Sequence, residues 1–158
     1  TEYRIYNIDK TFHSFEQLAQ LFRLFYEGMD EQGILLPIVQ QGEKLWLESL
    51  RFRLGKFAAV YVAETANRIV GFSSGYVKLL PDYLGSHKVG FIDGIYLLTE
   101  YRKRNMATEL YNALENWFHE QNVQSIELQV LTGNKDGKRF WDKMGFNEEL
   151  QQMRKILP

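Results

Sequence analysis

The sequence predicts a mixed α/β fold that forms a single domain, residues 1–158. Apolar residues recur every second position in some stretches and every third or fourth in others, as in strands and helices respectively. The order is strand, two helices, three strands, helix, strand, helix and strand. One helix links two strands as a β-α-β crossover, so we expect those two strands to be parallel and the rest of the central sheet to be mostly antiparallel. With 158 residues, 45% of them hydrophobic, the chain can bury one sizeable core.

The first third of the chain is predicted to contain one strand and two helices. Residues 3–8 alternate weakly, which favours a first strand. Ser14 and Gln17 have the spacing of a capping box, and the apolar stripe that follows predicts a helix to about Gly28. Glycines and a proline then indicate a loop, after which a second helix is predicted over residues 45–54.

The middle of the chain is predicted to form a hairpin followed by the central strand. Residues 57–64 and 69–80 are rich in β-forming residues, and the segment between them has the composition and length of a hairpin turn. Residues 91–98 are apolar on both faces, as in a strand buried on both sides. This central strand ends at Thr99, and a helix with one apolar stripe is predicted over residues 108–119.

The last part of the chain is predicted to hold two strands and a short helix. Residues 124–131 alternate, and we expect them to form the strand that runs parallel to the central strand. Asn134 or Asp136 is a candidate N-cap for a helix that ends near Met144. Residues 150–157 are predicted to form the last strand.

Composition and charge exclude several classes of function. A net charge of −1, from 19 basic and 20 acidic side chains, provides no field that would attract nucleic acid or an anionic membrane. The chain has no cysteine, and its three histidines show no metal-ligand spacing, so we expect no thiol nucleophile and no metal site. No apolar run is long enough to span a bilayer, and the first residues do not resemble a signal peptide; we therefore expect a cytoplasmic protein without a membrane partner.

The transition from the central strand to the next helix has the form of an anion site. A short polar and basic loop lies between them. A helix that starts after such a loop directs its unpaired N–H groups, and the positive end of its dipole, towards whatever lies over the loop. These groups suit a phosphate, whereas the alternative is a solvated basic turn that merely caps the helix.

The loop resembles the pyrophosphate loop of the GNAT superfamily of N-acetyltransferases. The family pattern is Arg or Gln, two residues, Gly, one residue, and then Gly or Ala. Arg102 and Ala107 match this pattern, and Asn105 stands where Gly is usual. Asn is a favoured non-glycine residue where the backbone needs a positive φ.

A second block, residues 134–146, is similar to the family's segment of Asn, helix, Phe-Tyr and Gly-Phe. It contains Asn134 and Gly145, and Trp141 replaces the usual Tyr. The resemblance covers about residues 57–146 and implies a GNAT-like central sheet flanked by helices. It also favours a homodimer.

The resemblance implies that acetyl-CoA is the acetyl donor. In the family, the loop binds the pyrophosphate and backbone groups at the end of the central strand pair with the pantetheine arm. The residues expected to bind the coenzyme are Tyr96, Leu97, Leu98, Arg102, Lys103, Arg104, Asn105, Met106, Ala107, Thr108, Asn134 and Trp141. An indole does not ionise usefully, so Trp141 cannot protonate the leaving thiolate; its ring either packs against the coenzyme arm or lies in the core.

Asp93 is the candidate catalytic residue. Acyl transfer needs a neutral amine, and neutralising a lysine-like amine of pKa about 10.4 at pH 7 costs roughly 4–5 kcal/mol, so a base or a desolvating site must assist. Asp93 lies on the central strand, where small-molecule members of the family place an acidic residue. The alternative is a structural carboxylate that is hydrogen-bonded to a neighbouring strand.

The acceptor is predicted from the end of the first helix, which forms one wall of the acceptor pocket in the family. Its Tyr26, Glu27, Asp30 and Glu31 combine negative charge with an aromatic ring, which favours a small cationic amine such as a polyamine or aminoglycoside. A solvated helix end is the alternative. Two other functions remain open: acetylation of a protein lysine or N-terminal amine, and coenzyme A binding without catalysis.

Overall fold

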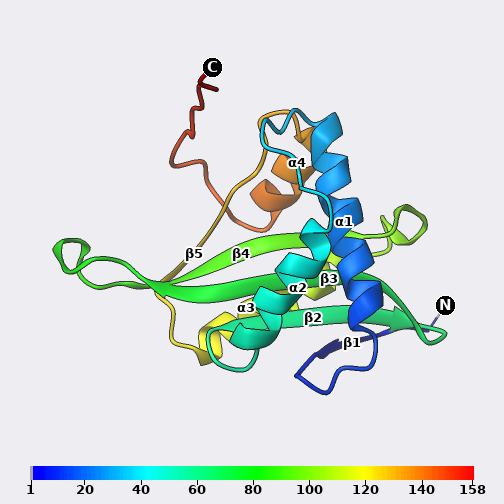
Figure 1. Cartoon of the computed structure of the whole chain (residues 1–158). Coiled ribbons are helices and arrows are strands. Elements are labelled where there is room, and N and C mark those ends of the chain that lie inside the picture. Colours follow the sequence, from blue (N-terminus) through cyan, green and yellow to red (C-terminus); the bar gives the residue numbers. More distant parts are fainter. Residues whose placement is uncertain (1) are drawn as a thin grey trace.

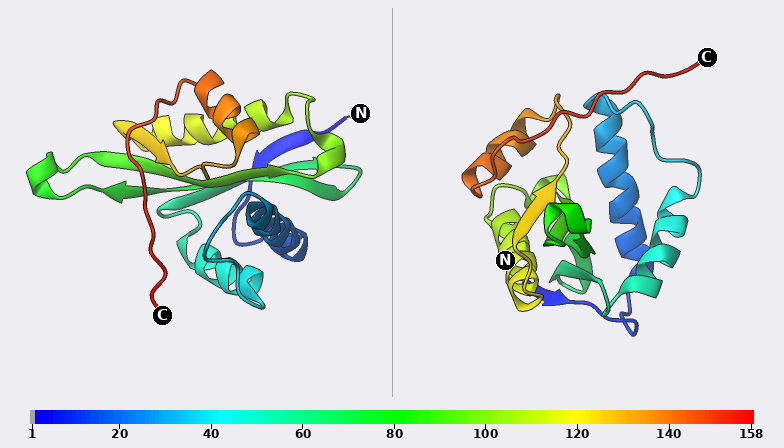
Figure 2. Two further views of the ribbon diagram at one scale, coloured as in Figure 1. Left: turned by 90° about the horizontal axis from the view of Figure 1, so that it is seen from above. Right: turned by 90° about the vertical axis from the view of Figure 1, so that its left-hand side faces the viewer.

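The computed structural model describes residues 2–158, which form a five-stranded sheet between two helical layers (Figures 1 and 2). The strands are β1 (Arg4–Asn7), β2 (Ala58–Thr65), β3 (Arg68–Leu79), β4 (Lys88–Leu97) and β5 (Ser125–Leu128). The α-helices are α1 (Phe15–Glu31), α2 (Gly42–Arg53), α3 (Met106–Glu120) and α4 (Lys135–Lys143). Short 3₁₀ turns occupy Asp82–Leu84 and Thr99–Tyr101.

The sheet is mixed, as predicted. Its strand order is β1-β2-β3-β4-β5, with antiparallel pairing from β1 to β4 and parallel pairing between β4 and β5. Helix α3 connects the two parallel strands, so the predicted β-α-β crossover is confirmed. The two views of Figure 2 show α1 and α2 on one face of the sheet and α3 and α4 on the other.

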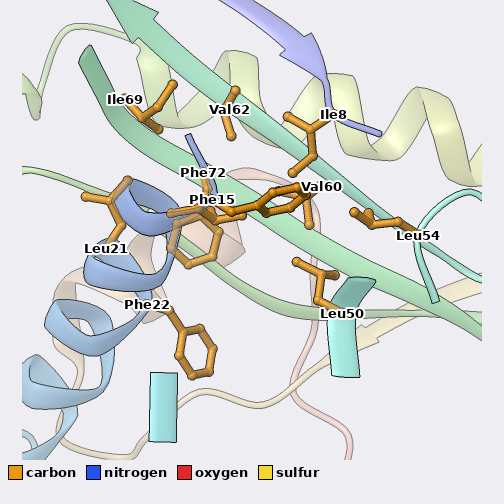
Figure 3. Close-up of a cluster of buried hydrophobic side chains, with 11 residues drawn as sticks. Ile8, Phe15, Leu21, Phe22, Leu50, Leu54, Val60, Val62, Ile69 and Phe72 are labelled. Carbon is orange, nitrogen blue, oxygen red and sulfur yellow. The ribbon is translucent and has the colours of Figure 1, made fainter. Parts of the chain in front are cut away.

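Each face of the sheet carries its own hydrophobic layer. Strand β2 shows how the sequence divides them: Val60 and Val62 pack with α1 and α2, whereas Ala59 and Ala63 pack with α3. This alternation follows from the two-residue period of a strand. Figure 3 shows the α1/α2 layer around Phe72. Fully burying a side chain of this size contributes about 1.5–3 kcal/mol.

The hairpin between β2 and β3 is confirmed. Ala66 and Asn67 both have positive φ, 48° and 61°. Two successive residues of this kind form the tight turn whose twist matches that of the flanking strands. The hairpin between β3 and β4 is longer and projects beyond the helices at the side of the molecule (Figure 1).

The predicted capping box at α1 is wrong, although Ser14 does occupy the N-cap position. The Ser14 side chain makes no capping hydrogen bond. Gln17 is used elsewhere, because its Oε1 accepts a hydrogen bond of 2.8 Å from the backbone N–H of Ile69. The glutamine therefore fastens α1 to β3 and leaves the helix end uncapped. The helix also continues three residues beyond Gly28, to Glu31.

The predicted last strand over residues 150–157 is also wrong. These residues are exposed and form no regular structure. Leu150 and Met153, for example, are 88% and 89% exposed. A strand requires a neighbour, and β5, which ends at Leu128, forms no backbone ladder with this segment.

Two further findings concern the described residues. Among the helices of residues 2–158, none is long and apolar enough to cross a membrane. In the same residues, no three His, Cys, Asp or Glu side chains are grouped so that they could hold a metal ion.

Candidate active site

The two parallel strands, β4 and β5, separate about midway along β4. Residues Val89–Ile92 of β4 pair with Ser125–Leu128 of β5, and the pairing stops there. Strand β4 continues to Leu97 and remains paired with β3 on its other edge. The edge of β4 beyond Ile92 is therefore free of a neighbouring strand, and backbone groups along it can bind a ligand.

The pairing pattern shows which backbone groups face this free edge. The N–H of Leu98 donates to Val70 O on β3, at 2.9 Å. Successive N–H groups along a strand point to opposite edges, so the groups of Tyr96 also face β3, and those of Ile95 and Leu97 face the free edge. Of the three strand residues expected to bind the coenzyme, the structure thus leaves Leu97 on the open side. Ile95 was missed because sequence periodicity does not give the phase of the hydrogen bonds.

The loop before α3 ends in a left-handed turn at Asn105. Its φ is 68°, as expected at a position where glycine is usual. Asn105 is the N-cap of α3, and its side chain makes no capping hydrogen bond. The first N–H groups of the helix, those of Met106, Ala107 and Thr108, therefore remain available to an anion. The Met106 side chain is buried, so only its backbone can take part.

Arg102 ties this loop to the free edge of β4. Its Nε donates a 2.9 Å hydrogen bond to Leu97 O, and its guanidinium lies 5.2 Å from the centre of the Tyr96 ring. Lys103 and Arg104 are exposed on the loop. The three cations thus differ: Arg102 fixes the loop, and the other two add positive charge in solvent.

Asp93 is the extra residue of a β-bulge. Ser74 of β3 pairs with Gly94 and Gly75 pairs with Ile92, so Asp93 has no partner of its own. A bulge re-aims side chains and increases the local twist. Ser74 and Asp93 meet on the face that carries α1 and α2, and a Cβ added to Gly94 on that face would lie 2.5 Å from the Phe25 ring. The bulge thus places two consecutive residues under α1.

The Asp93 carboxylate is partly buried and only half engaged. Its Oδ2 accepts a 3.0 Å hydrogen bond from Ser74 Oγ. Oδ1 has no hydrogen bond, and since no fully buried side-chain oxygen of residues 2–158 lacks one, Oδ1 is not fully buried. Burial raises the pKa of the Asp93 carboxyl, opposed by the Ser74 hydrogen bond and by the Arg53 guanidinium. Asp93 therefore makes the structural hydrogen bond to the neighbouring strand through Oδ2, and its Oδ1 remains without a partner.

Aromatic and basic side chains surround Asp93. Burial, followed by the negative charge of Asp93, raises the pKa of Tyr26. The same two causes raise the pKa of Tyr76, and the charges of Lys78 and Arg53 oppose them. The Arg53 guanidinium lies 5.6 Å from the Tyr76 ring centre. Sequence reasoning missed Ser74 and Tyr76, because only the register of β3 against β4 brings them near Asp93. It also missed Arg53, which comes from the end of α2.

The predicted acceptor residues divide into two groups. Tyr26 lies in the site, near Asp93. Glu27, Asp30 and Glu31 are exposed on the last turns of α1 and make no ion pair or side-chain hydrogen bond within residues 2–158. The structure therefore joins only the tyrosine of this group to the candidate base.

The second predicted block forms α4 and its surroundings. Asn134 caps α4, its Oδ1 accepting a 2.8 Å hydrogen bond from Gly137 N. Trp141 packs edge-on against Tyr111 and Phe146, with ring centres 5.8 and 5.3 Å away. The core packing considered for Trp141 is thus observed, and its contact with a coenzyme stays a prediction.

Comparison with known proteins identifies the family. Residues 4–146 match the model of the acetyltransferase (GNAT) family. No match is found among curated protein sequences. Solved structures are similar: the aminoglycoside N-acetyltransferase AAC(6')-Iy in complex with CoA has a TM-score of 0.78 at 17% identity, over 99% of this chain and 95% of its own.

Two further structures extend the comparison. A predicted acetyltransferase with acetyl-CoA from Clostridium acetobutylicum has a TM-score of 0.78 at 19% identity, over 98% of this chain and 96% of its own. A ribosomal-protein-alanine N-acetyltransferase from Brucella melitensis biovar Abortus 2308 has a TM-score of 0.70 at 16% identity, over 99% and 100%. At these identities the structures establish the fold, and the family model covers most of the sequence. The chain therefore belongs to the GNAT family of acetyl-CoA-dependent acetyltransferases.

Proposed function

We propose that the protein transfers an acetyl group from acetyl-CoA to a primary amine of a small cationic molecule, with Asp93 as the base. The observation that carries this proposal is the half-engaged Asp93 carboxylate, which lies in a bulge where the free edge of β4 begins. A base and an unpaired strand edge meet there.

The described residues fit the coenzyme at two points. The free edge of β4 offers the backbone groups of Ile95 and the N–H of Leu97 to the amides of the pantetheine arm, while Leu97 O accepts from Arg102. The uncapped start of α3 offers N–H groups to the pyrophosphate, beside the exposed cations Lys103 and Arg104. When bound, acetyl-CoA supplies the acetyl group as a thioester, so that a C–N bond forms as the C–S bond breaks and CoA leaves as the thiolate.

Asp93 receives the proton that the amine must lose. At pH 7 an amine of pKa about 10.4 is almost fully protonated, so an acceptor for its proton is needed. Oδ1 has no hydrogen bond and is not fully buried, so it can take this proton directly or through one water. Burial raises the pKa of Asp93 towards neutral pH, which makes it a stronger base than an exposed aspartate.

A small cation is favoured by the surroundings of Asp93. A partly buried carboxylate whose charge acts on Tyr26 can hold an ammonium group, and the Tyr26 ring can add a cation–π contact. The exposed Glu27, Asp30 and Glu31 on the same helix suit the further cations of a polyamine or aminoglycoside. Some solved structures of the same fold are aminoglycoside acetyltransferases, one of them in complex with sisomicin.

A panel of amines tests the proposal: polyamines, aminoglycosides, and peptides with free lysine or N-terminal amines. The readout is release of the CoA thiol, which a thiol reagent detects without background because the chain has no cysteine. We expect turnover on the polycations and little on the peptides. Turnover on peptides alone would indicate a protein acetyltransferase, and CoA binding without turnover would indicate a binding module.

A further inference from the structure

The start of α1 carries backbone donors that the protein itself does not use. The capping box does not form, because the Ser14 side chain makes no capping bond and the Gln17 oxygen is bound to β3. The first paired N–H group is that of Leu18, which donates to Ser14 O at 3.1 Å. The N–H groups of Phe15, Glu16 and Gln17 have no partner within residues 2–158. This helix end therefore offers three free donors and the positive end of the helix dipole.

The Ser14 hydroxyl is a second unused group at this helix end. Ser14 is only 8% exposed, and its Oγ makes no hydrogen bond in the described chain. Since no fully buried side-chain oxygen of that chain lacks a partner, Ser14 Oγ is not fully buried. Ser14 lines a cavity of about 300 Å³ in front of the helix. A polar group in a mostly buried residue is normally paired, so this hydroxyl favours a ligand in the cavity.

The other polar side chains of the cavity supply more donors than acceptors. They are His13, Glu16, Gln17 and Arg51. The Arg51 guanidinium lies 4.3 Å from the centre of the Phe15 ring, and within residues 2–158 it forms no ion pair. The Gln17 oxygen is occupied by β3, which leaves the Gln17 NH₂ group as a free donor. His13 already faces a carboxylate on β2, at 3.4 Å, and Glu16 is the acidic side chain that opposes an anion.

We propose that this cavity binds a small oxyanion of the phosphate type. The anion accepts hydrogen bonds from the first N–H groups of α1 and from Ser14 Oγ, and it pairs with Arg51. A cation is disfavoured there, since it would face the helix donors and a guanidinium.

The site is separate from the coenzyme loop and from the candidate base. Helix α3, whose start carries the coenzyme loop, lies on the opposite face of the sheet (Figure 2). Tyr26, which belongs to the candidate active site, lies roughly 18 Å further along α1 than Ser14. An anion bound at the start of α1 therefore neither occupies the coenzyme site nor reaches Asp93.

Titration of the CoA-saturated protein with inorganic phosphate tests the proposal, because the coenzyme then covers the other helix start at which phosphate could bind. The readout is the amide NMR spectrum of an isotope-labelled sample. The amides of Phe15, Glu16 and Gln17 should shift with a dissociation constant of about 1–10 mM, and those of Met106, Ala107 and Thr108 should not. The two groups of amides report separately, so the result does not depend on whether the enzyme turns over. Absence of the α1 shifts well above that concentration range, or equal shifts with chloride at the same ionic strength, would overturn the proposal.

Three variants test the residues of the cavity. Ser14→Ala and Arg51→Gln should each raise the phosphate dissociation constant by roughly three- to tenfold, and Glu16→Gln should lower it by roughly twofold. Because Ser14 Oγ has no partner in the protein, Ser14→Ala should leave the unfolding midpoint in phosphate-free urea unchanged. Arg154→Gln, which neutralises another exposed arginine, is the matched control and should bind phosphate as the native protein does. An unchanged constant in both Ser14→Ala and Arg51→Gln would show that phosphate binds elsewhere.

Discussion

The two edges of β4 differ in how completely they are paired. One edge faces β3 in nine residue pairs that extend from Lys88 to Leu97, and the other faces β5 in four pairs that end at Ile92. The paired edge fixes the strand in the core. The unpaired edge holds the backbone groups of Ile95 and Leu97 without a strand neighbour, close to Asp93. The candidate chemistry thus lies where the sheet is incomplete, on a strand that its other edge keeps in place.

The largest expected effect comes from a substitution that removes the candidate base beside the free edge of β4 and leaves the paired edge unchanged. Asp93→Asn keeps the size and the hydrogen bond from Ser74 but removes the base, so kcat/KM should fall by about 10²–10⁴-fold. The base acts only when deprotonated, so native activity should fall as the pH drops through the raised pKa of Asp93, and the variant should lose this dependence.

The control for this variant is Asp142→Asn, which changes an exposed carboxylate on α4. It should retain native kcat/KM at every pH. Asp93 is not the base if its asparagine variant keeps both the native rate and the native pH profile.

The next largest effect is on stability and comes from a substitution in the part of β4 that is paired on both edges. Gly90 lies in the part of β4 that has a neighbour on both edges, under Phe118 of α3, and a Cβ added there would lie 2.6 Å from that ring. Gly90→Ala should therefore lower the free energy of unfolding by about 1–3 kcal/mol, measured by denaturant titration.

Gly28 supplies the matched substitution, because it lies within α1 and an added Cβ would meet nothing within 4 Å. Gly28→Ala should raise stability by about 0.5–1 kcal/mol. Equal effects at the two glycines would contradict the close packing of Phe118 against the sheet.

The smallest effect is on CoA binding and comes from substitutions in the loop that precedes α3, beside the free edge. Asn105 has a φ of 68°, which costs an ordinary L-residue about 1–2 kcal/mol. Asn105→Val should weaken CoA binding, measured by calorimetry, by roughly tenfold, because the turn that exposes the α3 amides is strained. Asn105→Gly should bind CoA as the native protein does, and equal weakening in both would show that the Asn side chain itself matters.

The helices, the strands and the tight turn could be predicted from the sequence because they depend on local sequence patterns. Apolar periodicity predicted α1, α3 and the five strands β1 to β5 to within a few residues, and the composition of the turn after Thr65 predicted the hairpin. Asn105 was recognised as a positive-φ position from its place in the loop motif. Such features depend on residues that are close in the chain.

The site could be predicted only in part, because it depends on register. The bulge at Asp93 decides which side chains meet beneath α1, and no pattern in residues 90–98 indicates it. Ser74 and Arg53 reach Asp93 from other elements, so only the folded sheet reveals them. The prediction of a capping box was wrong for a similar reason. The Gln17 side chain accepts a hydrogen bond from the backbone N–H of Ile69 on β3 and does not bind the end of its own helix.

The bulge also determines where the chain tolerates a change in length. Asp93 and Gly94 lie on the same face, so deleting one of them would restore regular alternation without exchanging the faces of the later residues. Inserting or deleting one residue elsewhere in β4 would exchange the two faces of the rest of the strand and turn apolar side chains out of their layer. The segment between β3 and β4, by contrast, projects beyond both helical layers, so it can grow or shrink without consequence for the layers. Insertions and deletions among relatives should therefore be common in the segment between β3 and β4 and rare in β4 itself.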